Sequence, residues 1–563
     1  MPETERIRVP MKEQIAALLR NTLHELIAQG AIPEYDLETI SVSVPARKEF
    51  GDFSTNVAMI MASQAKKKPR DIAQTIQERM ARLSDVFDRV DIAGPGFINF
   101  TVSPLMWVRV LNTILEKKDR FGTSAFGRGK KVQVEFVSAN PTGPLHVGHG
   151  RGAAVGDTLA RILKAAGFKV ESEYYINDVG NQMNILGLSV LSRYREIFGK
   201  DSSFPENGYK GDYIRKIAQS LSEARGDELL CREESDAVTA CREFASDFIL
   251  NGIKEDLALF NVHFDQWFSE AALYRDHKVE HTLDFLKERG LSYEAEGALW
   301  FRTTGFGDEK DRVLRKQDGS LTYFAPDIAY HQDKLERGFK QIIDVWGADH
   351  HGYVPRMKAA IEALGADKDC FHALLIQLVS LVREGRPVSM STRSGEFVTL
   401  REIIDEVGKD VCRYFFMMRR SDAQLVFDLD LAKKKSEENP VYYIQYAHAR
   451  ICSILRNAAE QGLSPEPSLL EEDALSTGDD LDLIKMIAGY PDVVVSSAAD
   501  LEPHRISFYL LELATAFHRF YNRNRVISDD GRVTMARLIL VVAVKQVLAN
   551  ALSLMGIEAP ESM

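Results

Sequence analysis

The sequence contains few cysteines and no pattern that would hold a disulfide or zinc framework. Its 563 residues include only 5 cysteines, an odd number, and no two of them form a C-x-x-C pair. Small disulfide-rich domains and cysteine zinc sites depend on such pairs, so both classes are disfavoured. A reducing cytoplasm is the compartment that this cysteine usage predicts.

Long hydrophobic runs are also missing. The most apolar stretch, Leu538–Val544, is well short of the roughly 18 residues that indicate a membrane-spanning helix. The opening residues, MPETERIRVP, are polar and charged, unlike the apolar core of a signal peptide. We therefore expect no membrane span and no membrane partner.

Positive charge is in deficit. Lys and Arg number 70 and Asp and Glu number 82, which gives a formal net charge of −12. Phosphate backbones attract basic side chains, so an acidic chain is not typical of a nucleic-acid-binding protein. Net charge is a global sum, however, and local basic patches remain compatible with RNA binding. At about 150 residues per domain, the length predicts three or four domains.

The middle of the chain, residues 121–435, carries the pattern of a parallel sheet. Strand-like Lys131–Val137 is followed by a turn-rich loop, helix-like His146–Ala166 and strand-like Phe168–Ile176. A strand, a helix and a strand in this order form a βαβ unit, which predicts an α/β domain with a parallel, Rossmann-type sheet. We predict further elements later in this block: strands at Gln341–Trp346 and Phe371–Leu378, and a helical insertion at about 190–290.

Simpler folds flank this domain. Residues 1–120 are predicted to form a small α+β domain, with an amphipathic helix at Met11–Ile32 and short strands at Ile40–Val44 and Val90–Ala93. Residues 436–563 hold long helical patterns and are predicted to form an all-α bundle. We expect its helices at Val441–Glu460, Leu481–Ser497, Pro503–Ile527 and Val533–Met555.

The most informative segment is Ser138–Gly150, with the sequence SANPTGPLHVGHG. It stands between a strand and a helix, where exposed backbone amides and the helix dipole favour a phosphate group. His146 and His149 are three residues apart and share a face of the first helical turn, so both could donate hydrogen bonds to a polyphosphate. Gly148 would let a flat group lie against the backbone. The alternative is that the two histidines are solvated and only cap the helix.

This segment resembles the HIGH signature of class I aminoacyl-tRNA synthetases, and its extended form Val134–Arg151 resembles the arginyl-tRNA synthetases in particular. Other segments are similar to that family in the same order along the chain: Tyr175–Gln182, Tyr323–Tyr330, Trp346–Tyr353, Val388–Gly395 and Leu554–Met563. The resemblance implies a ligase that activates L-arginine with ATP to arginyl-adenylate and then transfers the arginyl group to the 3′ end of tRNA(Arg). It also implies Mg²⁺ bound with the nucleotide and a monomeric enzyme.

The resemblance also assigns the nucleotide site. It places His146 and His149 at the ATP phosphates, and Gly143, Pro144 and Gly148 beside the nucleotide. Catalysis would then depend on positioning and on stabilising negative charge on the phosphates. Some arginyl enzymes have a lysine just before the HIGH turn, where this chain has Gly143.

The second signature of the class, a K-M-S-K-type loop, aligns with Ser389–Thr392, so both lysine positions are uncharged here. The resemblance places Met390 and Ser391 at ATP. We predict that Arg393, helped by Arg386, supplies the missing positive charge as a catalytic residue. A degraded, inactive loop is the alternative.

The amino-acid pocket must fit a guanidinium group, which is planar, permanently charged and best met by carboxylates. Tyr323 and Asp327 are four residues apart and would face the same way at a helix start. The resemblance places six residues at the substrate arginine: Ser138, Asn140, His149, Tyr323, Asp327 and Asp349. Ordinary structural hydrogen bonding is the alternative for each. Asp349 is followed by two histidines, but adjacent residues point in opposite directions, so we expect no protein metal site.

Basic and aromatic residues alternate in His518–Arg525, HRFYNRNR. Aromatic rings stack on unpaired bases and arginines meet phosphates, so Arg519 and Arg523 are candidate tRNA ligands. The alternative is that the aromatic rings belong to the core. The resemblance assigns the bundle to anticodon binding, with Tyr442, Tyr446 and Arg450, and the N-terminal block to the tRNA elbow, with Phe50, Phe53 and Asn56.

Three rival functions stay open. They are a class I synthetase for another amino acid, a nucleotidyltransferase with a similar histidine turn, and a non-catalytic tRNA-binding paralogue. The absence of zinc-ligand cysteines counts against a cysteine-charging enzyme, and the helical tail counts against a plain nucleotidyltransferase. Only the uncharged second signature favours the non-catalytic protein.

Overall fold

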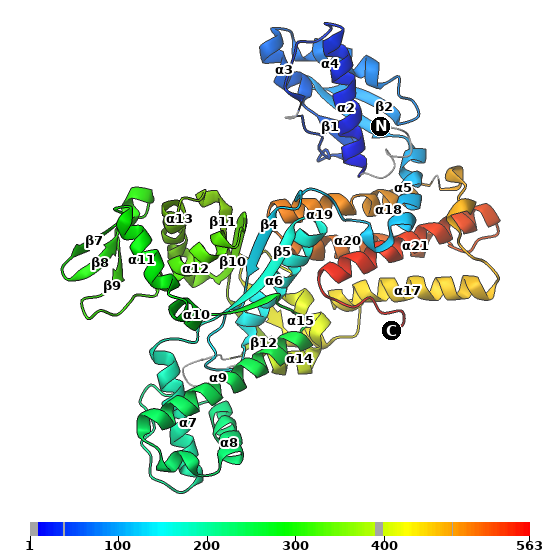
Figure 1. Ribbon diagram of the computed structural model, residues 1–563. Helices are drawn as coiled ribbons and strands as arrows, with labels where there is room; N and C mark the ends of the chain where they lie inside the picture. Colours follow the sequence, from blue (N-terminus) through cyan, green and yellow to red (C-terminus); the bar gives the residue numbers. More distant parts are fainter. Residues whose placement is uncertain (1–9, 38–39, 389–397, 476) are drawn as a thin grey trace.

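The computed structural model describes residues 10–37, 40–388, 398–475 and 477–563. Figure 1 shows an N-terminal domain set apart from the rest, a central sheet with helices around it, and a set of long C-terminal helices. This arrangement agrees with the predicted fold class of a parallel-sheet domain between an α+β domain and a helical bundle. The residue boundaries predicted for the domains stay predictions.

The central sheet has five strands, all parallel, in the order β11-β10-β4-β5-β6. The strands are β4 (Lys131–Glu135), β5 (Lys169–Ile176), β6 (Gln266–Ser269), β10 (Gln341–Gly347) and β11 (Phe371–Ile376). The chain moves from β4 toward β5 and β6 on one side and later returns to β10 and β11 on the other. Ligands of such sheets bind at the carboxyl ends of the strands where this order reverses, here between β4 and β10.

Helix α6 (Val147–Ala165) connects β4 to β5 and lies close against the sheet. Gly156 permits this approach, because a Cβ atom there would lie 2.2 Å from the Phe136 ring. The helix ends before Gly167, whose φ of +89° suits glycine. The βαβ unit predicted from the sequence is therefore confirmed.

The interval between β5 and β10 is richer than the predicted helical insertion. It contains α7 (Asn181–Ile197), α8 (Asp212–Arg225), η4 (Glu228–Cys231), α9 (Glu234–Leu259), α10 (Glu270–Arg275), α11 (Lys278–Glu288), η5 (Thr303–Phe306) and α12 (Phe324–Glu336). Strand β6 lies inside the interval 190–290 yet belongs to the main sheet. A second sheet, β7 (Ser292–Ala295), β8 (Ala298–Phe301) and β9 (Arg312–Arg315), follows it and is antiparallel.

The chain leaves β11 for a small second layer beside α6. After β10 come η6 (Ala348–Tyr353), α13 (Val354–Ala363) and η7 (Lys368–Cys370), and after β11 come β12 (Val379–Arg383), β13 (Arg386–Pro387), α14 (Leu400–Val407), α15 (Lys409–Phe416), β14 (Leu425–Asp428) and α16 (Leu429–Lys433). Strand β12 pairs with β13 and, in parallel, with β14. This layer connects the parallel sheet to the bundle.

The N-terminal domain is a three-stranded antiparallel sheet covered by helices, in the order β1-β3-β2. Its elements are α2 (Met11–Ala28), η2 (Lys48–Phe50), β1 (Phe53–Thr55), α3 (Val57–Ala65), α4 (Pro69–Met80), β2 (Phe87–Ala93) and β3 (Phe97–Val102), followed by α5 (Pro104–Lys117) and η3 (Lys118–Arg120). The strand expected at Ile40–Val44 is reduced, within the described residues, to one bridge between Ser43 and Ser54.

The C-terminal residues form the predicted bundle. It consists of α17 (Pro440–Glu460), η8 (Pro467–Leu469), η9 (Glu472–Ala474), α18 (Gly478–Ala488), α19 (Tyr490–Ala499), α20 (His504–Arg523) and α21 (Gly531–Leu554). The helix expected at Leu481–Ser497 is divided in two at Gly489, because Pro491 in the first turn of α19 cannot continue α18. By length and composition α21 could cross a membrane, but 72% of its apolar window is buried inside the protein, as in the core helix of a bundle.

Candidate active site and RNA-binding faces

The loop after β4 starts with two residues in the left-handed region. Val137 has φ +69° and Ser138 has φ +42°, which is unfavourable for a non-glycine residue and most of all for a β-branched one. Two hydrogen bonds hold the turn: Ser138 Oγ donates to Glu135 Oε1 (2.9 Å) and accepts from the Tyr175 amide (3.2 Å). Strain of this kind is found where a site must present a loop in one fixed shape.

His146 and His149 cap the start of α6 and stack on one another. The Gly148 amide donates to His146 Nδ1 (3.1 Å), and the His146 amide donates to His149 Nδ1 (3.3 Å). The two rings are 3.7 Å apart at an angle of 18°. Since each Nδ1 accepts a hydrogen bond, the proton of each neutral ring lies on Nε2, which is therefore the donor.

Both imidazoles are neutral at physiological pH. Burial lowers the pKa of His146, and burial together with the neighbouring His146 lowers the pKa of His149 to about 3. The pair therefore offers hydrogen bonds but no formal charge. The two readings of the sequence, helix caps and phosphate donors, are compatible, because capping uses Nδ1 and leaves the proton on Nε2.

Three residues predicted at ATP, Met390, Ser391 and Arg393, lie outside the described residues. The chain that follows them is tied to the histidine turn: the Val147 amide donates to Val398 O (3.4 Å) and the Leu400 amide to Leu145 O (2.8 Å). Arg386 is exposed on β13.

Gly143 and Pro144 are half-buried in the loop that leads to the histidines. The Tyr213 hydroxyl donates to Thr142 O (2.8 Å), and a Cβ at position 143 would lie 3.1 Å from that hydroxyl oxygen. A lysine here would have to fit beside the Tyr213 ring. The structure thus gives a steric reason for glycine at this position.

A cavity of about 240 Å³ opens beside the histidine turn at the carboxyl ends of β4 and β10. Ser138 and Asp327, both predicted at the substrate arginine, line it. The Tyr353 hydroxyl donates to Asp327 Oδ2 (2.5 Å), and burial raises the pKa of Asp327 although this hydrogen bond opposes the rise. The other side chains of the lining are Glu135, Val137, Tyr175, Tyr330, His331, Asp344, Val345, Trp346, His350, Tyr353 and Met357.

Glu270 is a further acidic residue, which lies near Asp327 but outside the cavity lining and was not predicted from the sequence. It is buried at the start of α10, directly after β6. Burial, and then the nearby Asp327 carboxylate, raise the pKa of Glu270 to about 7. Its position at the carboxyl end of a strand of the parallel sheet is the signal that could have found it, but the edge strand β6 was not predicted from the sequence.

A buried charge network supports the cavity floor. Lys334 Nζ donates to Glu135 Oε2 (2.6 Å) and to Asp344 Oδ1 (2.9 Å). His331 Nε2 lies 3.0 Å from Asp344 Oδ2, and its Nδ1 lies 2.8 Å from the Asp327 carbonyl oxygen. Both ring nitrogens face oxygen acceptors, so only an imidazolium would make both hydrogen bonds.

Among the residues that the structure describes, three carboxyls line this cavity, those of Glu135, Asp327 and Asp344, and Glu270 lies near Asp327. Lys334 pairs with Glu135 and Asp344, and His331 pairs with Asp344, so the Asp327 and Glu270 carboxyls are not part of these ion pairs. A buried carboxylate without a partner is unfavourable, so the site favours a cationic ligand.

The other residues predicted at the arginine are placed differently. Tyr323 is 73% exposed and is not in the cavity lining, although it stands one turn before Asp327. The Asp349 side chain is 82% exposed and pairs with His350 at 3.6 Å, so its predicted role at the substrate is not supported. Asn140 is exposed, and its amide donates to Gln182 Oε1 (2.9 Å).

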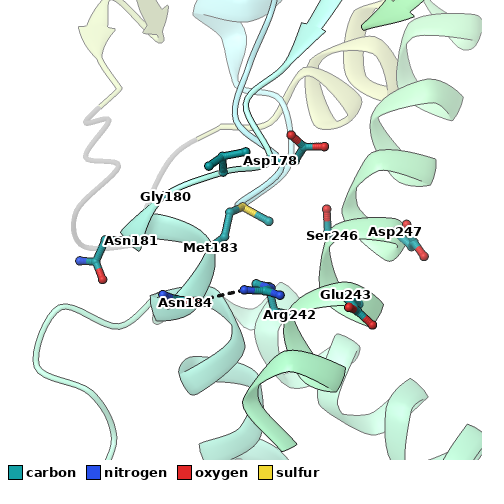
Figure 2. A pocket seen from close by; sticks show the side chains of 10 residues that line it. Asp178, Gly180, Asn181, Met183, Asn184, Arg242, Glu243, Ser246 and Asp247 are labelled. Atoms are coloured by element: carbon teal, nitrogen blue, oxygen red, sulfur yellow. Dashed lines mark hydrogen bonds between the residues drawn. The ribbon is translucent and has the colours of Figure 1, made fainter. Parts of the chain in front are cut away.

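A larger hollow of about 750 Å³ lies apart from this cavity. Figure 2 shows that its walls come from the loop and first turn of α7 on one side, with Asn181 and Asn184, and from α9 on the other, with Arg242 and Glu243. Arg242 donates to Asn184 Oδ1 (3.2 Å) across it. It shares no lining residue with the acidic cavity.

The bundle brings together the residues predicted on α17 with a second helix. Tyr442 stacks on Tyr446, and the Arg450 guanidinium lies 4.5 Å from the Tyr446 ring and 4.9 Å from the Tyr521 ring. Arg450 also donates to His518 Nδ1 (3.2 Å). Tyr521 is exposed on α20, and so are Arg519 and Arg523.

The aromatic residues in and next to His518–Arg525 fall into two groups, one in the core and one at the surface. Phe517 and Phe520 are core residues, as the alternative held, whereas Tyr521 and the arginines face solvent. An exposed aromatic and cationic face of this kind can stack unpaired bases.

The N-terminal candidates behave differently again. Phe53 is only 4% exposed and stacks on Trp107, with ring centroids 6.0 Å apart. The Phe53 ring therefore packs against α5, and its predicted place at the tRNA elbow stays a prediction. Phe50 is exposed, and Asn56 is half-buried at the start of α3.

The comparisons with known proteins agree with this geometry. Family models match residues 13–102 (arginyl tRNA synthetase N terminal domain), 110–422 (tRNA synthetases class I (R), catalytic domain) and 444–563 (DALR anticodon binding domain). Proteins named arginine–tRNA ligase from Syntrophotalea carbinolica and Citrifermentans bemidjiense are 54% and 52% identical, each over 98% of this chain and 100% of the relative. The arginyl-tRNA synthetase structure from Thermus thermophilus has the same fold, with a TM-score of 0.74 and 23% identity over 97% of this chain and all of its own.

The class I catalytic-domain model covers more than half of the chain, including the parallel sheet and the histidine turn, so the protein is a class I aminoacyl-tRNA synthetase. Within that class, the chain belongs to the arginyl-tRNA synthetase family.

Proposed function

We propose that this chain is an arginine–tRNA ligase that forms arginyl-adenylate from L-arginine and ATP and then loads the 3′ end of tRNA(Arg). The observation that carries the proposal is the pairing of two different surfaces at one edge of the sheet. A neutral imidazole pair caps a helix N-terminus, and an acidic cavity with too few cations lies beside it. The relatives named arginine–tRNA ligase support the same activity.

In the first step, the carboxylate oxygen of arginine attacks the α-phosphorus of ATP and pyrophosphate leaves. Asp327 and Glu270 hold the guanidinium, and the strained Val137–Ser138 turn separates the cavity from the histidine turn. His146 and His149 donate from Nε2 to phosphate oxygens, where negative charge must be stabilised. In the second step, a hydroxyl of the terminal ribose attacks the arginyl carbonyl carbon and AMP leaves.

Mg²⁺ would neutralise the phosphates of the nucleotide. Over the described residues, no three His, Cys, Asp or Glu side chains gather as a metal site. Magnesium typically keeps waters and binds substrate phosphates, so the ion would arrive with ATP. The face of the bundle that carries the exposed Tyr521 and the half-buried Tyr442, Tyr446 and Arg450 would read the tRNA anticodon. The enzyme would act as a cytoplasmic monomer.

The test is ATP–pyrophosphate exchange with each of the twenty amino acids, with and without tRNA(Arg). Exchange should depend on arginine and be strongest with tRNA present, and the purified enzyme should charge tRNA(Arg). Exchange driven by another amino acid would identify a different class I synthetase. No exchange and no charging, together with retained tRNA binding, would favour the non-catalytic paralogue.

A further inference from the structure

Arg151 is a buried cation close to the histidine turn, and none of the roles described so far uses it. It stands on α6 two residues after His149, and its side chain is fully buried. Nη1 donates to Gln377 O (2.8 Å) and Ala423 O (2.9 Å), and Nη2 donates to Arg420 O (2.8 Å). All three partners are backbone carbonyls from outside α6.

These carbonyls lie where the chain passes from the parallel sheet, which ends at β11, to the β13-β12-β14 sheet. Gln377 lies between β11 and β12, while Arg420 and Ala423 lie in the turn before β14. The Gln377 amide donates to Ser421 O (2.9 Å), and β12 pairs with β14 directly beyond this point. The Arg151 guanidinium therefore connects the N-terminal part of α6 to the end of the β12–β14 sheet at which Val379 pairs with Leu425.

The same turn of α6 is held from a second direction. Leu145 and Val147 make backbone hydrogen bonds with Leu400 and Val398 on either side of the histidine cap. A Cβ at Gly150 would lie 2.7 Å from Leu400 Cδ1, so the start of α14 packs closely on α6. Arg151 and these backbone hydrogen bonds therefore hold the histidine turn together with β12, β14 and the start of α14.

The chemistry of the Arg151 site differs from that of an ordinary buried ion pair. Arg413 is equally buried, and it has both carbonyl partners and the Asp157 carboxylate (2.5 Å). Among the described residues, the hydrogen-bond partners of Arg151 are three carbonyls and no carboxylate. Burial lowers the pKa of Arg151 to about 10, although Asp422 opposes the shift. A buried cation without a hydrogen-bonded carboxylate is unfavourable for folding. The presence of arginine here is explained instead by the three hydrogen bonds of its planar guanidinium, which fix the relative positions of three backbone segments.

We propose that Arg151 is a positioning residue for adenylate formation, which holds the β13-β12-β14 sheet, and with it Arg386 on β13, at a fixed distance from His146 and His149. This inference rests on the proposed ligase function. The acidic cavity is lined by residues other than Arg151 and its three carbonyl partners, and the Lys334 hydrogen bonds beside it involve none of them. A shift of the β12–β14 sheet should therefore affect ATP and leave the arginine subsite unchanged.

The experiment compares Arg151→Met and Arg151→Lys with the matched variant Arg413→Met in the full-length enzyme. KM values for ATP and for arginine are measured separately by pyrophosphate exchange, because a KM does not depend on the fraction of folded enzyme. For Arg151→Met we expect a higher KM for ATP and a kcat lower by up to about a hundredfold, the size of effect that a small misplacement can cause. The KM for arginine should stay at the wild-type value.

The two other variants separate positioning from stability. Arg151→Lys keeps a charge and donors and should recover part of the lost kcat. Arg413→Met leaves Asp157 buried without its main partner, so it should lower the thermal unfolding temperature while both KM values stay normal. If Arg151→Met does not fold, Arg151→Lys alone must show the ATP-selective change.

Equal shifts of both KM values, or an unchanged KM for ATP and kcat in the Arg151 variants, would overturn the proposal. A wild-type enzyme without arginine-dependent exchange would instead refute the proposed function. The two failures are therefore distinguishable.

Discussion

The two halves of the active site bind charged ligands with different kinds of side chain, neutral imidazoles in one half and carboxyl groups in the other. The nucleotide half presents two neutral imidazoles, whose protons are fixed on Nε2 by helix-capping hydrogen bonds. The amino-acid half presents the carboxyls of Asp327 and Glu270, whose pKa values are raised by burial and, for Glu270, also by the neighbouring Asp327 carboxylate. A polyanion is thus met by dipoles and donors, whereas a monocation is met by full negative charge.

This difference follows from the ligands. Under the proposed function ATP would arrive with Mg²⁺, and neutral donors that do not compete with the metal would suffice to orient its phosphates. A guanidinium has no counter-ion of its own, and selecting it against neutral amino acids requires a desolvated carboxylate. The contrast predicts that substitutions and pH will affect the two halves separately.

The largest effect should come from the carboxylate that lines the cavity. Asp327→Asn removes the charge opposite the guanidinium, and breaking a buried charge pair of this kind costs about 2–5 kcal/mol. We expect kcat/KM for arginine to fall by roughly a thousandfold, with the KM for ATP unchanged. Steady-state pyrophosphate exchange measures both.

Asp349→Asn is the matched control for this substitution. Its carboxylate is exposed, so the change should leave arginine kinetics at the wild-type level. Comparable losses in the two variants would contradict the assignment of the cavity.

The nucleotide half should respond less, but in kcat. His149→Ala removes one Nε2 donor, and loss of a donor to developing phosphate charge typically costs about a hundredfold. Loss of the cap should also reduce stability by about 1 kcal/mol, which thermal unfolding reports separately. An Ala variant with normal kcat would show that the imidazoles serve only as caps.

Acid should separate the halves without any mutation. Glu270 has a raised pKa of about 7, and a bound guanidinium favours its ionised form, so arginine binding releases a proton when the pH is below that value. The KM for arginine should rise as the pH falls below 7, by at most about tenfold per unit. The KM for ATP should show no inflection from His149, which stays neutral down to about pH 3.

Glu270→Gln supplies the control for the pH profile. The KM of this variant for arginine should be higher than that of the wild type at every pH. It should not change between about pH 6 and 8, the range in which Glu270 titrates in the wild type. A profile that keeps the wild-type slope would assign the titration to another group.

The smallest effect should belong to neither half. Arg450→Lys on the exposed face of the bundle replaces a planar guanidinium between the Tyr446 and Tyr521 rings, a contact worth about 0.5–1 kcal/mol. We expect a KM for tRNA that is higher by about two- to fivefold, with unchanged KM values for ATP and arginine. Arg456→Lys, on the same helix but bonded to the Glu561 carbonyl, should have no effect on tRNA.

Local patterns allowed much of this architecture to be predicted. The β4–α6–β5 unit is encoded within fewer than fifty residues, and so is the histidine turn, because both depend on neighbours in sequence. Strand β6 could not be predicted in the same way, since four residues carry little periodicity and its place in the sheet depends on pairing with β5 across the α7–α9 insertion. Glu270 was missed for that reason.

Side-chain environment was harder to predict than element type. Phe53 belongs to a motif that suggests RNA contact, yet packing of the N-terminal domain against α5 buries it. The Lys334 network joins residues from β4, α12 and β10, and only the folded sheet brings them together. Tyr323 and Asp327 were correctly expected on one helix start, but only Asp327 lines the cavity.

Arg413 connects parts of the chain that are distant in sequence. It donates to the Met555 carbonyl at the end of α21, to the Phe260 carbonyl at the end of α9 and to Asp157 in the middle of α6. The parallel sheet and the C-terminal bundle should therefore lose their structure as one cooperative unit, giving a single heat-absorption peak. Substitutions near Met555 should then change the unfolding temperature of α6, the helix at whose start both imidazoles lie.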